Sequence, residues 1–182
     1  SELPRPIEIL DLPGVYDLHL DTPEGAIART ALHGASAQPD DAVVIVVDAC
    51  NLARNLVLVS QILPGEHRVV VALNMSDLAA QRGLVIDAAE LSRRLGVPVV
   101  PMAARKGTGL NALRAALLTA WRAPVQLPAA NATPEVSMAW AERVAADVTS
   151  GDHGVDSVDH LTERLDRVLT HPVLGLLVFL GV

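Results

Sequence analysis

The sequence is short of aromatic residues, of cysteine and of positive charge, and each shortage excludes a class of protein. Aromatic residues make up 2% of the 182-residue chain, so a core must be built from Val, Leu, Ile and Ala. The single cysteine, Cys50, excludes an internal disulfide framework and suits a reducing cytosol. The formal net charge of −7 argues against a nucleic-acid surface, because no basic stripe is present to neutralise phosphates.

A long apolar run and a secretory signal are also missing from the residues present. The first ten residues lack a charged region followed by an apolar one, so no signal peptide is expected in them. The last segment, 172–182, has no charge but is too short to cross a bilayer, which needs about 20 residues. It is either a buried C-terminal helix or the first turns of a membrane helix, and its lack of a polar face favours the second.

Short apolar runs alternate with helical patterns along the first two thirds of the chain. The runs predict strands at 7–10, 42–48, 69–73 and 97–101. Helices are expected at 22–33, 51–63, 87–96 and 110–121, the third with Asp87 as its cap. The alternation predicts an α/β fold with a mostly parallel sheet, in which the run 42–48, apolar on both faces, is a central strand.

A Pro/Ala-rich segment, 124–134, then marks a break in composition. The first helix expected after it has Thr133 as its cap and Pro134 at its first position. A second helix is expected to start near Asp156. The chain therefore reads as an α/β domain followed by a small all-helical domain.

The stretch Asp11, Leu12, Pro13 and Gly14 is a D-x-x-G motif placed at the end of the first predicted strand. An Asp there can hold a magnesium ion through a water, and a Gly leaves its backbone N–H free to approach a terminal phosphate. The motif alone is weak, because an ordinary strand-end turn has the same residues.

A second motif, N-x-x-D, follows the strand at 69–73 and consists of Asn74, Met75, Ser76 and Asp77. A carboxylate at the edge of guanine accepts from the ring N–H and the exocyclic amine together, and adenine offers no such pair. The loop after the strand at 97–101 follows in sequence, and its backbone N–H groups are expected to meet the guanine carbonyl. Two motifs at strand ends of one sheet predict a guanine-nucleotide site.

The stretches DLPGVYDL, VVDACNLARNL, VALNMSD and PMAARKGTG, in this order and spacing, resemble the GTP-binding domain of the FeoB ferrous iron transporters. The segment HLTERLDRVLTHPVLGLLVFLGV resembles the region where the cytosolic helical domain of that family enters its first membrane helix. The resemblance covers essentially the whole chain. It implies an incomplete Ras-like P-loop G domain over 1–123, a linker at 124–134, a helical domain over 135–171 and the start of a truncated transmembrane helix at 172–182.

The resemblance also implies a function and a set of binding residues. The chain would be the guanine-nucleotide-binding cytosolic part of a bacterial ferrous iron transporter, at the cytoplasmic face of the cell membrane, with the membrane permease as its partner. Self-association is left open. GTP or GDP would contact Asp11–Gly14, Asn74–Asp77 and the loop of Ala103, Ala104 and Arg105, and Asp11 would hold Mg²⁺ through a water.

Several family features are absent from this sequence. No G-x-x-x-x-G-K-[ST] motif is present, and the switch threonine is missing, so an N-terminally truncated domain is expected. Because most phosphate contacts are missing, weak nucleotide binding and negligible hydrolysis are expected. Val15 also cannot orient an attacking water as a glutamine does. Ala103 stands where the family loop has Ser and loses a bracing hydroxyl, and nothing in the chain marks an iron site.

Two alternatives to a transporter remain open from the residues. One is a degenerate, non-catalytic G domain that acts as a regulatory protein-interaction module. The other is a fragment of a ribosome- or tRNA-associated GTPase, which the acidic charge and the apolar C-terminal segment both disfavour.

Overall fold

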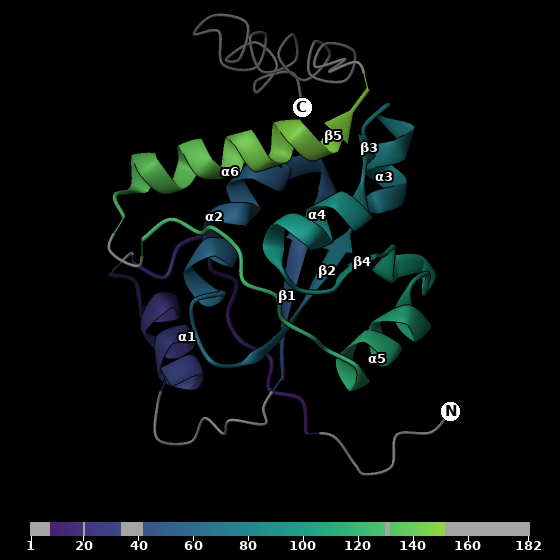
Figure 1. Cartoon of the computed structure of the whole chain (residues 1–182). Coiled ribbons are helices and arrows are strands. Elements are labelled where there is room, and N and C mark those ends of the chain that lie inside the picture. The colour runs from purple at the N-terminus through teal and green to yellow at the C-terminus, as the bar shows by residue number, and fades with distance from the viewer. Residues whose placement is uncertain (1–7, 20, 34–41, 130–131, 152–182) are drawn as a thin grey trace, which may run out of the picture.

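A three-stranded parallel sheet lies at the centre of the molecule (Figure 1). The computed structural model describes residues 8–19, 21–33, 42–129 and 132–151. The strands are β1 (Ala42–Asp48), β2 (Arg68–Asn74) and β4 (Val99–Pro101), in the spatial order β1-β2-β4. The predicted α/β class with a parallel sheet is therefore confirmed.

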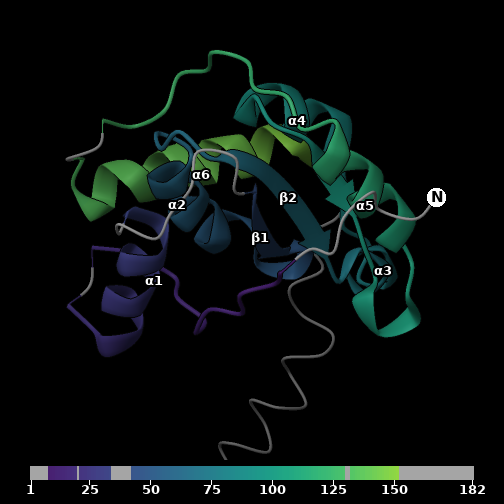
Figure 2. The same ribbon diagram turned by 90° about the horizontal axis from the view of Figure 1, so that it is seen from below.

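Helices lie on both faces of this sheet, as Figures 1 and 2 show. The α-helices are α1 (Pro23–His33), α2 (Leu52–Ile62), α3 (Ser76–Gln81), α4 (Ala88–Leu95), α5 (Leu110–Leu118) and α6 (Pro134–Val148). Two short 3₁₀ turns are η1 (Ala49–Asn51) and η2 (Ala104–Lys106), and a small antiparallel ladder joins β3 (Val85–Ile86) to β5 (Thr149–Ser150).

The central strand is β2, whose side chains are buried on both faces of the sheet. Val71 and Leu73 belong to the main core, which also holds buried residues of α2, α4 and α6. Val70 and Ala72 point to the opposite face and pack with Val100, where α5 supplies the cover. A strand buried on both faces reads as a continuous apolar run, as this one does.

The predicted central position of the run 42–48 is wrong, because β1 is an edge strand of the described sheet. Ile45 and Val47 face the core and are 4% and 0% exposed. Val44 and Val46, on the other face, are 37% and 62% exposed. Both faces of β1 are apolar in sequence, but only one is covered within the described part of the chain.

The strand predicted at 7–10 is also wrong over its described residues, since 8–10 have no strand conformation. Ile9 and Leu10 are 86% and 73% exposed, and neither pairs with the edge of β1. An apolar segment becomes a strand only where a neighbour supplies ladder hydrogen bonds and a core to face. The D-x-x-G stretch therefore does not sit at the end of a strand.

The helix predictions fare better. Helices α1, α2, α4 and α6 are confirmed, and α5 ends at Leu118, earlier than predicted. The Asp87 carboxylate accepts from the Glu90 N–H at 2.9 Å, as the predicted cap requires. The helix predicted from Asp156 and the apolar segment 172–182 lie outside the described residues. Among the described helices, none is both long and apolar enough to cross a membrane.

Candidate functional site

The polar ends of β2 and β4 meet at one edge of the sheet. Leu73 of β2 is paired with Pro101 of β4, so both strands end at the same level. The backbone N–H of Met102 donates to the Leu73 carbonyl at 2.8 Å, and the Ser76 N–H donates to the Met102 carbonyl at 3.0 Å. The loop after β2 and the loop after β4 are thereby held against each other.

Asn74 fixes the relation between the two loops. Its side-chain oxygen accepts a hydrogen bond from the backbone N–H of Ala104 at 3.0 Å. This bond holds the loop after β4 against the loop after β2.

Met75 has an unusual backbone conformation and sets the direction of the chain after Asn74. Its φ is 58°, which makes it the non-glycine residue with positive φ in the described part of the chain. The left-handed region costs a residue with a Cβ about 1–2 kcal/mol, so such a residue marks a constrained position. The turn is closed by the Ser76 hydroxyl, which donates to the Leu73 carbonyl at 2.7 Å. It places Asp77 in the first turn of α3.

The carboxylate of Asp77 faces Lys106, the last residue of η2. One carboxylate oxygen lies 2.6 Å from Nζ of Lys106, and the two side chains are 33% and 59% exposed. The Lys106 ammonium lowers the pKa of Asp77, chiefly through this hydrogen bond. Asp77 is therefore an ionised acceptor at neutral pH, as recognition of guanine requires. Sequence reasoning missed Lys106 as a partner, although it is the only lysine in the sequence.

Backbone N–H groups of the loop Ala103–Arg105 form hydrogen bonds within the protein, which the sequence did not predict. The Ala103 N–H donates to the Thr108 carbonyl at 3.2 Å, and the Ala104 N–H is taken by Asn74. Two of the three backbone donors proposed for a guanine carbonyl are thus engaged within the protein. A base carbonyl would have to use Arg105 or replace one of these bonds.

The D-x-x-G stretch is not joined to these loops. Asp11, Pro13 and Gly14 are exposed, and Leu12 is half-buried. Among the described residues, no hydrogen bond or ion pair connects Asp11–Gly14 with Asn74–Asp77 or Ala103–Arg105. A Cβ built on Gly14 would meet nothing within 4 Å, so its backbone is accessible. The described residues include no cluster of three or more His, Cys, Asp or Glu that could hold a metal ion.

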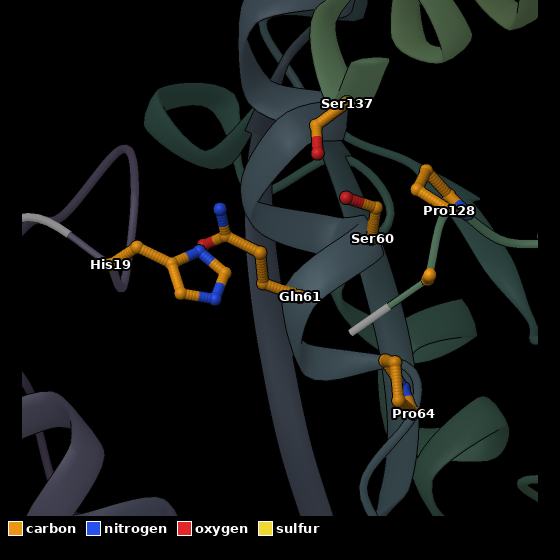
Figure 3. A pocket seen from close by; sticks show the side chains of 7 residues that line it. His19, Ser60, Gln61, Pro64, Pro128 and Ser137 are labelled. Carbon is orange, nitrogen blue, oxygen red and sulfur yellow. The ribbon is translucent and has the colours of Figure 1, made fainter. Parts of the chain in front are cut away.

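A cavity of about 60 Å³ lies elsewhere (Figure 3). It forms where residues 15–19, the segment after D-x-x-G, meet α2 and α6. Its lining residues are His19, Ser60, Gln61, Pro64, Pro128, Ala129 and Ser137. No sequence pattern predicts this cavity, because its walls come from four separate segments of the chain.

The fold and the paired loops after β2 and β4 define a Ras-like G domain. The family model described as ferrous iron transport protein B matches residues 2–117, and the chain belongs to this FeoB family. The Fe(2+) transporter FeoB of Legionella pneumophila (strain Paris) is 44% identical over 115 residues, which are 62% of this chain. The Fe(2+) transporter FeoB of Helicobacter pylori (strain J99 / ATCC 700824) is 32% identical over 187 residues, with 96% of this chain covered.

A solved structure of a FeoB cytosolic domain, in its GMPPNP form, has a similar fold. The cytosolic domain of the T. maritima FeoB iron transporter in GMPPNP form has a TM-score of 0.55 and 34% identity. The match covers 60% of this chain and 44% of that one. The matched regions amount to 15% of the Legionella relative and 28% of the Helicobacter relative, so this chain corresponds to a small part of those proteins.

Proposed function

We propose that this chain is the guanine-nucleotide-binding cytosolic part of a bacterial ferrous iron transporter, in which nucleotide state is coupled to iron uptake. The observation that carries the proposal is the junction of two loops, where Asn74 braces Ala104 and Asp77 is held as an ionised acceptor. The names of the relatives and the GMPPNP form of the T. maritima domain support the same assignment.

Recognition of the base rests on Asp77. Its two carboxylate oxygens accept from the ring N–H and the exocyclic amine of guanine, while adenine presents no such donor pair. Lys106 contacts one of these oxygens in the structure, so guanine has to displace the ammonium or share the carboxylate with it. Met75 and Ser76 hold the turn that presents Asp77, and Arg105 supplies the remaining backbone donor of the facing loop.

The phosphate end of the nucleotide is assigned to Asp11–Gly14. The exposed Asp11 carboxylate suits a Mg²⁺ ion held through a water, because this ion commonly takes one or two carboxylates and completes its shell with water and phosphate oxygens. The open space around Gly14 leaves its N–H accessible to the terminal phosphate. Leu12 and Pro13 connect the two groups, and Val15 offers no group to orient water, so hydrolysis should be negligible.

The chain would work at the cytoplasmic face of the bacterial cell membrane. Residues 1–123 form the G domain, 124–134 the linker, and 135–171 a helical domain leading into a membrane helix at 172–182. Its partner is the membrane permease of the same protein. A homo-oligomer of the chain is a second possible assembly. Helix α6 packs on α2 and so links the helical part to the G domain. This packing supports the proposed coupling between nucleotide state and the membrane permease.

The test is the base preference of an Asp77→Asn variant. Binding of GDP, ADP and xanthosine diphosphate is measured by calorimetry on this chain and on a fusion that carries a G-x-x-x-x-G-K-[ST] segment before Ser1. Loss of two hydrogen bonds to a charged acceptor, each worth about 1.5–3 kcal/mol, should weaken GDP binding by about 100-fold or more. Xanthosine diphosphate should bind the variant better, because the new amide can donate to its C2 carbonyl.

The matched control is Asp87→Asn, the same change at the start of another helix. Asn caps a helix as well as Asp does, so this variant should keep both stability and base preference. A guanine preference that survives Asp77→Asn would refute the assignment. An absence of guanine preference in both forms of the wild-type protein would instead favour the non-catalytic regulatory module, to which Val15 and the engaged N–H groups of the loop Ala103–Arg105 also point.

A further inference from the structure

We propose that Gln61 is a positioning residue that ties the segment after D-x-x-G to helix α6, so that a displacement of one is passed to the other. The inference rests on the proposed function for the origin of the signal, which is the nucleotide state at Asp11–Gly14. The contacts that would pass the signal on run from this segment through Gln61 to the cavity beside α6.

Gln61 lies in the last turn of α2 and uses both ends of its side-chain amide on the segment. Its oxygen accepts from the backbone N–H of Leu18 at 2.7 Å. Its nitrogen donates to the carboxylate of Asp17, also at 2.7 Å. Two bonds to adjacent residues fix both the position and the direction of the segment, which one bond could not do.

Further contacts hold the same segment against α1 and α2. Leu18 is 5% exposed and belongs to the main core. Its carbonyl accepts a hydrogen bond from Arg29 of α1. The Arg54 guanidinium of α2 lies 4.4 Å from the centroid of the Tyr16 ring. The stretch that directly follows Gly14 is therefore bound to the body of the protein, whereas no hydrogen bond or ion pair among the described residues holds Asp11–Gly14.

The opposite side of Gln61 leads to α6. Gln61 lines the cavity together with His19 of the segment and with Ser60 and Ser137, which are 4% and 5% exposed. Figure 3 shows His19 beside Gln61, and the hydroxyls of Ser60 and Ser137 facing each other. The linker residue Pro128 closes the same cavity. The segment, α2, the linker and the N-terminal half of α6 thus border one small space.

Polar contacts gather at the C-terminal end of α6 and hold it in place. The Asp87 N–H donates to the Val148 carbonyl at 2.8 Å. Arg94 of α4 forms an ion pair with Asp147 at 2.6 Å. The strand after α6 is paired with β3. A shift of Gln61 would therefore move α6 mainly at the end near Ser137, which follows the linker.

The experiment follows hydrogen exchange in the 182-residue chain without nucleotide, so its result does not depend on nucleotide binding. Asp17→Ala removes one of the two bonds from the segment side and leaves α2 unchanged. Gln61→Glu places two carboxylates together and breaks the same bond from the other side. Both variants should speed exchange about 3- to 10-fold in residues 15–19 and in residues 134–141, as expected for loss of a net hydrogen bond.

A rescue variant separates coupling from simple damage. Asp17→Asn combined with Gln61→Glu exchanges donor and acceptor, so both bonds can form again and exchange should return to within about twofold of wild type in both regions. The control Gln81→Glu makes the same change on the exposed surface of α3 and should alter neither region. Faster exchange at 15–19 with an unchanged rate at 134–141 in Asp17→Ala, or no recovery at 134–141 in the rescue variant, would overturn the inference. Failure of the proposed function is a different result, namely an absence of guanine preference in the calorimetry.

Discussion

Two glycines in the loop after β4 allow the support of the base site to be tested in depth. Gly107 and Gly109 both have positive φ, 70° and 87°. A Cβ on Gly107 would find its nearest neighbour, a methyl group of Leu110, at 3.9 Å. A Cβ on Gly109 would lie 2.5 Å from the Pro101 carbonyl oxygen and 2.9 Å from Cγ of Met102. Both positions therefore need a left-handed backbone conformation, but only Gly107 has room for a Cβ.

This difference allows the loss in free energy of unfolding to be estimated for each alanine substitution. The left-handed conformation alone should cost Gly107→Ala about 1–2 kcal/mol. Gly109→Ala should cost the same amount plus about 1–3 kcal/mol for overpacking against backbone atoms, about 2–5 kcal/mol in total. The second variant should also weaken guanine binding, because Met102 carries the hydrogen bonds that join the loops after β2 and β4.

The assay is urea unfolding followed by circular dichroism, with the free energy of unfolding obtained by linear extrapolation. Gly107→Ala is the control for the backbone term. Equal destabilisation by the two variants would refute the steric argument. A Gly109→Ala protein that is less stable but keeps its full guanine affinity would refute the role of this contact in holding the base loop.

Three further predictions concern charge, core and cap. Lys106→Gln should raise the pKa of Asp77 toward its ordinary value in an NMR titration, and an unchanged titration would exclude the ion pair. The pKa of Asp77 in the folded protein lies below the unfolded value of about 3.9, so the ion pair stabilises the fold fully above that pH. This stabilisation is lost as the pH falls through the folded pKa. The free energy of unfolding of the variant should therefore decrease less in acid than that of the wild type. Leu56→Ala, at a side chain that is 0% exposed, should cost about 2–5 kcal/mol in urea unfolding, while Val46→Ala should stay within about 0.5 kcal/mol. Asp87→Ala should cost about 1 kcal/mol by losing the cap of α4, a loss that Asp87→Asn avoids, and equal stability of the two variants would contradict the cap.

Sequence patterns predicted those helices and strands that depend only on neighbouring residues in the chain. The cap at Asp87 and the apolar run of β2 identify a helix start and a buried strand from a few neighbouring residues. Ile9 and Leu10 show the limit of such reasoning, because strand formation depends on a partner that the segment itself does not contain. Val46 shows a related limit: its apolar character suits either face, and only the neighbouring elements decide whether it is covered.

The candidate site divides along the same line. The N-x-x-D motif and the facing loop were predicted from their positions after two strands, and β-sheet register brings them together. The ion pair of Asp77 with Lys106 and the two bonds of Gln61 join residues that are distant in sequence. No periodicity encodes these contacts, so they emerged only from the three-dimensional arrangement.

The position of the only lysine has a practical consequence for spectroscopy. Amine-directed reagents can modify the ε-amine of Lys106 and the chain's terminal amine, and no other amine in this sequence. Reductive methylation with isotope-labelled formaldehyde would therefore put a small, charge-preserving reporter directly at the carboxylate of Asp77. Its resonance would follow the arrival of a purine at that carboxylate without any change to the coding sequence.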